Sequence, residues 1–328
     1  MAPRPIRTHP VQHEFSPARI GELPLPTDAA TPRASWVSEL AFTLKASRPG
    51  FYGTAIWFFL LPYGGQIPVA NGAFWLALCY ITLPLGMLIY AGNDLSDVET
   101  DRLNPRKDSF LFGARPTPDQ RFELPWRIAL IQVPFVALFT AIWGAKALLW
   151  FAVLVCGSAL YNRKGGGAKD LPVVDLLSQC GYLLVFVLSD WTRGAASPWF
   201  VYAFGFAFAM HSHAFGQIMD SAPDARAGRR TTAVWLGAAR SKLLIAAILV
   251  SEVWLASFFP FKAYLVPLLA CGALFFLADA LVWRERPYPL NFLKMFFVGF
   301  NAALFVEIAL VASGADLDGF YRSLFRIL

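Results

Sequence analysis

Two short acidic segments interrupt an otherwise strongly apolar sequence, and their residue types could bind a metal ion. The first, "NDLSDVETD", contains Asn93, Asp94, Asp97 and Asp101. The second, "DSAPDARAG", contains Asp220 and Asp224. Each follows a long apolar stretch. On a helix, the spacings i, i+3, i+7 and i, i+4 place side chains on one face, so each segment predicts a line of converging carboxylates.

Carboxylates that crowd together repel one another and resist the loss of water. A divalent cation removes that cost. Mg²⁺ prefers oxygen ligands, keeps several waters, and bridges carboxylates to a phosphate group of a substrate. We therefore expect the six residues to be metal ligands, with the five aspartates acting in catalysis, and the two segments to face each other across a diphosphate.

Basic residues near both segments support an anionic substrate. Arg and Lys side chains neutralise phosphate, and glycines let the backbone approach it. Arg48 lies inside the first apolar stretch, where an ionisable side chain predicts an interior anion as its partner. The remaining candidates for diphosphate binding are Arg106 and Lys107, Lys164 and Lys169 beside Gly165–Gly167, and Arg229 and Arg230.

The elements that must position these residues are membrane helices. The 328 residues are 57% hydrophobic and only 15% charged, against about 25% charged in soluble domains. A helix needs about 20 mostly apolar residues to cross a bilayer. The sequence predicts an all-α membrane protein with about nine such helices, at 38–62, 70–92, 126–144, 146–162, 173–190, 197–216, 242–260, 262–283 and 290–313.

The distribution of Lys and Arg predicts the orientation of these helices. Basic residues gather in the N-terminal segment and in alternate loops, and positive charge marks the cytoplasmic side. We expect a multi-pass protein of a bacterial inner membrane, with its N-terminus and both acidic segments on the cytoplasmic side. The net charge of +6 then needs no nucleic-acid partner. Because the acidic segments lie four helices apart, we expect two related four-helix units, plus a ninth helix, around a central cavity.

The remaining features are less informative. Residues 1–35 are rich in Pro and Arg, lack an apolar core, and predict a flexible cytoplasmic tail before a membrane domain at 36–328. The four cysteines lie inside apolar stretches without metal-ligand spacing, which indicates small core residues. His211, His213 and Gln217 precede Asp220 by one to three helical turns. They either orient a ligand or take a proton, or they form hydrogen bonds between helices.

The sequence resembles the UbiA superfamily of intramembrane prenyltransferases over roughly residues 38–313. The similarity rests on "NDLSDVETD", on "DSAPDARAGRRTTAVWLG", on "SRP" at Ser47–Pro49 and on the helix pattern. It implies a prenyl diphosphate held through Mg²⁺ between the two acidic segments. It also implies that the allylic C–O bond ionises and that aromatic residues shield the resulting cation. A lipophilic acceptor, either an isoprenoid or an aromatic compound, would then attack the cation.

The sequence departs from the family pattern at two places. Many members that use aromatic acceptors have N-R-P-x-R-P after the first segment, where this chain has "NPRKDSFLFGA" from Asn104. The family often has Y-x-x-x-K in the loop after the fourth helix, whereas Tyr161 and Lys164 here are one residue closer. "NPRK" and "AMHSHAFGQIMDSAPDARAGRRTTA" are more similar to the lycopene-elongase branch, in which the acceptor is a carotenoid alkene.

Two other functions remain open at the level of sequence. A terpene cyclase of the same fold would ionise the diphosphate with the same aspartates and use no separate acceptor, so products formed without acceptor would reveal it. A transporter or a non-catalytic lipid-binding protein would show broken midplane helices and charge buried away from the loops. Here the charge gathers at one face of the membrane, as a diphosphate site requires.

Overall fold

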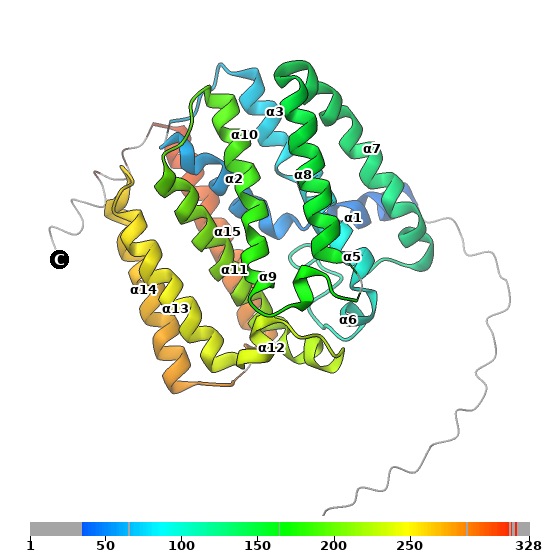
Figure 1. The fold of residues 1–328 in the computed structure, drawn as a ribbon, viewed down its shortest axis with the longest axis vertical. Helices are drawn as coiled ribbons and strands as arrows, with labels where there is room; N and C mark the ends of the chain where they lie inside the picture. Colours follow the sequence, from blue (N-terminus) through cyan, green and yellow to red (C-terminus); the bar gives the residue numbers. More distant parts are fainter. Residues whose placement is uncertain are drawn as a thin grey trace, which may run out of the picture. The chain divides into compact units, whose positions relative to one another are not determined.

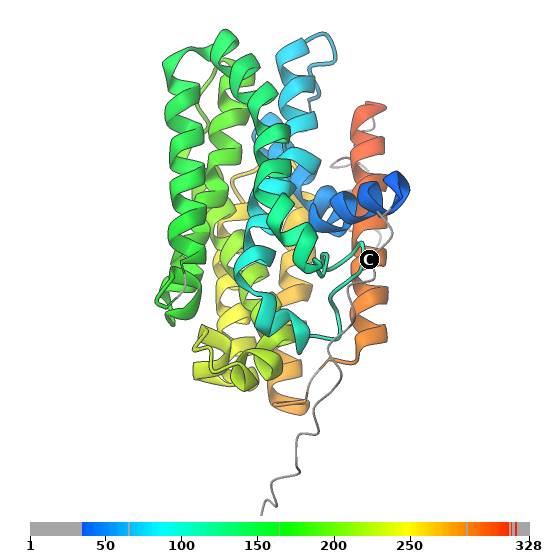
Figure 2. The same ribbon diagram turned by 90° about the vertical axis from the view of Figure 1, so that its right-hand side faces the viewer.

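The described part of the chain is helical, and within it only Ser109 and Gly113 form an isolated bridge of β type. The computed structural model describes residues 35–64, 66–163, 165–286, 288–314, 316 and 319. The predicted tail, apart from Ser35, and Lys164 therefore lie outside the described residues. From Trp36 onward the chain forms one unit, drawn in Figures 1 and 2.

The helices follow the predicted order closely. Their bounds are α1 Trp36–Ala46, η1 Pro49–Phe51, α2 Tyr52–Leu60, η2 Leu61–Tyr63, α3 Gly72–Tyr80, α4 Leu83–Gly86, η3 Met87–Ala91, α5 Gly92–Ser96, α6 Val98–Arg102, α7 Pro118–Trp143, α8 Ala145–Asn162, η4 Ala168–Asp170, α9 Val174–Leu177, η5 Ser178–Leu183, α10 Leu184–Arg193, α11 Trp199–Arg226, α12 Thr232–Leu236, α13 Ala238–Ala256, α14 Lys262–Val282 and α15 Leu290–Ala312.

Six helical segments are long and apolar enough to cross a membrane, and each covers one predicted span. They are Gly72–Ser96, Pro118–Trp143, Ala145–Asn162, Val174–Arg193, Lys262–Val282 and Leu290–Leu310. Helices α11 and α13, of 28 and 19 residues, cover two further predicted spans. They are less apolar because α11 carries two histidines and α13 carries Arg240, Lys242 and Glu252. The all-α membrane architecture is thus confirmed.

Apolar side chains cover the outside of the bundle, as in a protein surrounded by lipid. Trp126, Leu130, Leu149 and Leu281 each expose more than 60% of their surface. The four cysteines, at positions 79, 156, 180 and 271, are also exposed, so the prediction that they are core residues was wrong. The physical reason is that a membrane helix is apolar on its lipid-facing side as well as inside, and apolar context alone does not separate the two.

The first predicted span, 38–62, is not one helix. It breaks after Ala46, because Arg48 adopts a left-handed backbone conformation with φ of 54° and Pro49 follows it. Proline disfavours a helical conformation at the preceding residue. In Figure 2, α1 (blue) lies across the long helices and does not run parallel to them. The break turns Arg48 toward the interior of the bundle.

The first acidic segment lies at a second break. Helices α3, α4, η3 and α5 run almost without interruption to Ser96, and η3 is a single π-helical turn, a feature often found at functional sites. The backbone leaves the helix at Asp97, with φ of −99° and ψ of 16°, and α6 begins at Val98. The helix is thus interrupted within the first segment. Asp94 and Asp101 still share Lys107, whereas Asp97 pairs with Lys169, and all three side chains are buried.

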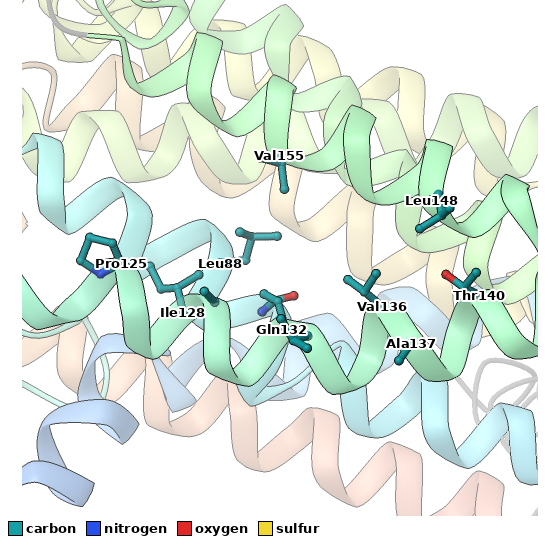
Figure 3. Close-up of a pocket in the computed structure, with 11 residues that line it drawn as sticks. Leu88, Pro125, Ile128, Gln132, Val136, Ala137, Thr140, Leu148 and Val155 are labelled. Atoms are coloured by element: carbon teal, nitrogen blue, oxygen red, sulfur yellow. The ribbon is translucent and has the colours of Figure 1, made fainter.

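Helices α7 and α8 form a hairpin on the outside of the unit. A capping box starts α7, because Gln120 N–H donates to Thr117 Oγ1 at 3.3 Å and Thr117 N–H donates to Gln120 Oε1 at 3.1 Å. Gly144, with φ of 67°, makes the turn. A mostly apolar groove of about 690 Å³ runs between α7, α8 and Leu88 of η3, with Gln132 at its base (Figure 3). Its lining is mostly the apolar side chains that α7 and α8 direct toward lipid.

Both acidic segments lie at the same end of the bundle. In Figure 1 the short elements α5, α6, α9 and α12 gather toward the lower part of the view, below α3 and α10. The long helix α11 packs against α13, η5 and α12 and carries the second acidic segment in its last two turns. Its upper part packs through aromatic rings: the Phe208 ring centroid lies 5.1 Å from that of Trp57, and the Phe204 ring centroid lies 5.2 Å from that of Phe259. The membrane bundle thus holds the polar end in place.

The contact between Gly86 and Ser47 provides a test of this arrangement. A Cβ atom on Gly86 would lie 2.4 Å from the backbone oxygen of Ser47, directly before Arg48. We expect Gly86→Ala to lower the free energy of unfolding by about 2 kcal/mol, because backbone must move to admit the methyl group. Thermal unfolding in detergent measures the effect. Gly72→Ala is the matched control, since no atom lies within 4 Å of its Cβ position. Equal midpoints for the two variants would contradict the close packing.

Candidate active site

Buried carboxylates and buried cations alternate at the first acidic segment. Asp94 is only 1% exposed, and its Oδ1 accepts from Arg48 Nη2 at 2.7 Å and from Lys107 Nζ at 2.6 Å. Lys107 Nζ also lies 2.8 Å from Asp101 Oδ2. The interior anion expected for Arg48 is therefore Asp94, and one ammonium group lies between two carboxylates of the segment.

Asp97 faces a different set of partners. Lys169 Nζ donates to its Oδ1, and Asn93 Nδ2 donates to its Oδ2 at 2.8 Å. The same ammonium group donates to Ser96 Oγ and, at 3.2 Å, to Asn162 Oδ1. Lys169 is only 5% exposed, so the loop after α8 contributes a fully paired cation to this segment.

The second acidic segment meets the first through two arginines. Arg106, which follows the first segment, pairs with Asp220, and Asn104 Nδ2 donates to the same Oδ1 at 2.6 Å. Arg229 Nη1 lies 3.5 Å from Asp224 Oδ1 and 3.4 Å from Asp97 Oδ2. Arg229 thus joins the two segments directly, and the structure brings them together at one place.

Three further residues were predicted to bind the diphosphate: Tyr161, Lys164 and Arg230. Arg230 is exposed and makes no ion pair within the described ranges. Lys164 lies outside those ranges. Tyr161 lies on the last turn of α8, and its Oη is 3.3 Å from His213 Nε2. It therefore contacts α11 near the acidic segments.

Sequence reasoning missed three polar residues that support the site. Asn104 is 5% exposed and binds Asp220, and Arg229 Nε donates to Asp170 Oδ1 at 2.8 Å. Asp175 is fully buried, and its carboxylate accepts from Gln217 Nε2 and from the Thr232 backbone N–H, both at 2.6 Å. Asp170 and Asp175 both lie in "AKDLPVVD", where two acids at the start of an apolar stretch were the available signal.

Partly buried aromatic side chains lie beside the paired charges. The Arg48 guanidinium lies over the Tyr90 ring, 4.9 Å from its centroid, and Tyr161 contacts His213. These side chains form an aromatic wall next to the carboxylates.

The electrostatics show how crowded the carboxylates are. Burial works against ionisation of Asp97, but Lys169 and Arg229 outweigh it and lower its pKa. Burial, with a contribution from neighbouring Asp94, raises the pKa of Asp101 to about 6 although Lys107 opposes the shift. Burial also lowers the pKa of Lys169, against the attraction of Asp97. Burial thus disfavours the charged form of Asp101 more strongly than Lys107 favours it.

These residues fit a hard divalent cation. Within the described part of the chain, no three carboxylate, imidazole or thiol side chains already converge as a metal cluster, because Lys107, Lys169 and Arg229 lie between the carboxylates. Asp94 Oδ2 is buried and has no hydrogen-bond partner. An unpartnered carboxylate oxygen beside an acid with a raised pKa is a suitable ligand for a cation that carries more charge than one ammonium group.

The buried ion pairs should contribute more to the free energy of unfolding than the exposed ones do. We expect Lys169→Met to lower the free energy of unfolding by about 3 kcal/mol, because it removes the nearest cation from a buried carboxylate. Lys45→Met is the control, since its pair with Asp108 is exposed and should contribute less than about 1 kcal/mol. Chemical denaturation of both variants in detergent gives the comparison. If the two substitutions cost the same, the buried pair does not stabilise the site.

Comparisons with known proteins identify the family of the chain. The chain matches the UbiA prenyltransferase family over residues 51–301. It is 24% identical to a lycopene elongase/hydratase from Corynebacterium glutamicum over 206 residues, covering 62% of this chain and 71% of the relative. It is 30% identical to a lycopene elongase/hydratase from Haloarcula japonica over 217 residues, covering 60% and 68%.

A solved structure shares the fold. The structure of a UbiA homolog from Archaeoglobus fulgidus, bound to DMAPP and Mg²⁺, superposes with a TM-score of 0.64 at 17% identity. The match covers 83% of this chain and 99% of that chain. The family match covers most of the sequence and all the apolar helices from α3 to α14. The chain is an integral membrane protein that belongs to the UbiA prenyltransferase family.

Proposed function

We propose that this protein is a Mg²⁺-dependent prenyltransferase, which ionises a prenyl diphosphate and transfers the prenyl group to a lipophilic acceptor. The observation that carries the proposal is the meeting of the two acidic segments, joined by Arg229, beside an aromatic wall. Charge suits the diphosphate, and the wall suits the prenyl chain. A lipid bilayer around the bundle would supply both lipophilic substrates.

The metal ligands in this proposal are the acidic residues together with one amide. They are Asn93, Asp94, Asp97 and Asp101 from the first segment and Asp220 and Asp224 from the second. When bound, Mg²⁺ supplies positive charge that offsets the carboxylates and favours departure of pyrophosphate. A match to a protein bound to DMAPP and Mg²⁺ supports this assignment at the level of the fold.

The cations of the site would bind the diphosphate oxygens. Arg48, Lys107 and Lys169 each contact a carboxylate through one or two donors. Arg and Lys carry further donors that can turn to phosphate without leaving the site. Arg106 and Arg229 would act in the same way from the other side. Tyr161 and Arg230 are assigned to the rim of the diphosphate site, and Lys164, which lies outside the described residues, stays a candidate for diphosphate binding.

The aromatic wall would protect the allylic cation from water. The faces of Tyr and Phe rings attract positive charge, and the position of the Arg48 guanidinium over Tyr90 shows such a face directed at a cation. We propose an acyclic carotenoid as the acceptor, because the relatives are named as lycopene elongases. Residues 36–328 would form the catalytic domain, with the site on the cytoplasmic side as Lys and Arg predict.

The aspartates provide the first test of this function. We expect Asp97→Ala and Asp220→Ala each to reduce pyrophosphate release at least about 100-fold, because each removes a charge that orients the metal. Asp108→Asn is the control. It alters an exposed carboxylate near the first segment, and Asn tolerates its left-handed conformation. Turnover at the wild-type rate in either alanine variant would remove these residues from the metal site.

The products identify the reaction. Purified protein is incubated with Mg²⁺ and dimethylallyl, geranyl or geranylgeranyl diphosphate, with and without lycopene, and hexane extracts are analysed by mass spectrometry. We expect pyrophosphate release to depend on lycopene, and a product heavier by one or two prenyl groups. Cyclic hydrocarbons formed without acceptor would instead establish a terpene cyclase. Binding of the diphosphate without any turnover would refute both enzymes and favour a lipid-binding protein.

A further inference from the structure

Helix α11 carries two histidines whose surroundings are opposite in kind. His213 precedes Asp220 by seven residues, which is almost two turns, so both side chains lie on one face of α11 about 10 Å apart along its axis. His211 precedes Asp220 by nine residues, which is two and a half turns, so it lies on the opposite face. Its Nδ1 is 2.5 Å from Oε1 of Glu252, a fully buried residue of α13.

His213 lies on the side of α11 that faces the active site. Its Nε2 is 3.3 Å from Tyr161 Oη on α8, and the two rings meet edge to face with centroids 6.1 Å apart. The ring is partly buried, on the face of α11 that also carries Asp220. Across the described ranges no hydrogen bond reaches its Nδ1.

The contact with Tyr161 fits two tautomers of His213, and the scheme uses the one in which Nε2–H donates to the Tyr161 oxygen. In that tautomer the neutral imidazole keeps its acceptor at Nδ1. An enclosed imidazole with a free acceptor, on the face of α11 that carries Asp220, is placed to act as a general base.

We propose that His213 takes the proton that ends the transfer to an alkene acceptor. This inference rests on the proposed function. In the reaction, the allylic carbon forms a C–C bond with one alkene carbon while its C–O bond breaks and pyrophosphate leaves with the electron pair. The other alkene carbon becomes a carbocation. A neighbouring C–H bond gives its proton to Nδ1 and its electron pair to a new double bond, leaving an alkene and an imidazolium.

The position of His213 along α11 suits this step. The allylic carbon is bonded directly to the diphosphate, so the acceptor cation forms a few bonds beyond the acidic segments, in the direction of the apolar interior. His213 lies about 10 Å from Asp220 in that direction. Tyr161 holds the ring by its other nitrogen, so Tyr161 is a positioning residue in this scheme. His211 is directed at Glu252 and takes no part.

The test separates proton removal from ionisation. His213→Gln keeps a hydrogen-bonding side chain for Tyr161 but has no base. With dimethylallyl diphosphate, Mg²⁺ and lycopene, we expect pyrophosphate release within about threefold of wild type, because the metal site is intact. The yield of alkene adduct per pyrophosphate should fall about 100-fold. Prenyl alcohol, or an adduct heavier by one water, should replace the alkene because water then captures the cation.

The control is His211→Gln, which changes the same residue type on the opposite face and retains a hydrogen bond to Glu252. Its adduct yield per pyrophosphate should match wild type, and thermal unfolding in detergent checks that both variants fold. A second variant, His213→Ala, leaves a space for the missing ring. Added imidazole should restore the alkene adduct at least tenfold in His213→Ala, with no such effect on the wild type.

Two results would overturn the assignment of His213. One is an unchanged adduct yield per pyrophosphate in His213→Gln. The other is a parallel fall of pyrophosphate and adduct in a folded variant without rescue by imidazole, which would show a role in binding the diphosphate. A wild-type protein that releases no pyrophosphate from any donor would refute the proposed function itself. The proposal that His213 is the base would then be refuted as well.

Discussion

The need to neutralise several carboxylates inside an apolar bundle shapes this end of the molecule. An isolated buried carboxylate costs several kcal/mol, so each must find a cation or a hydrogen-bond donor. Those partners come from segments far apart in the sequence. Arg48 comes from the break after α1, Lys169 from η4, and Arg229 from the turn after α11. Charge pairing therefore fixes several loops at once, where apolar packing has little influence.

Irregular backbone is the means by which these charges reach each other. Arg48 adopts a left-handed conformation next to Gly113, whose Cβ would lie 2.7 Å from Arg48 Nε, and the Ser109–Gly113 turn closes over the pair. Asp97 leaves the helical conformation between α5 and α6 and turns toward Lys169 and Arg229, not toward Lys107. A straight helix would direct all three aspartates of the first segment toward the same lysine. Because of the break, Asp94 and Asp101 pair with Lys107, whereas Asp97 pairs with Lys169.

Much of the fold follows from apolar stretches alone. Their lengths predicted the order and the approximate bounds of the long helices, because the bilayer imposes one length on every span. The breaks at Arg48 and Asp97 could not be predicted in the same way, since tertiary ion pairs stabilise them. The exposure of the four cysteines could not be predicted either. Apolar side chains are found both where a helix faces lipid and where it faces the protein interior, so the sequence does not distinguish the two. At the site, residue type identified the acidic and basic groups, but only the structure pairs Arg229 with both segments.

The same pairing has a consequence for catalysis. Cations that stabilise buried carboxylates are also the groups that a diphosphate would use, so the site is preorganised before substrate arrives. Arg229 donates to Asp170 through Nε and lies at longer distances from Asp97 and Asp224 through Nη1. The shorter contact with Asp170 holds the side chain in place, while Nη1 can leave Asp97 and Asp224 to bind a phosphate oxygen. Under the proposed function, such a site would keep its shape without a ligand and still offer positive charge to the pyrophosphate leaving group, as ionisation of an allylic diphosphate requires.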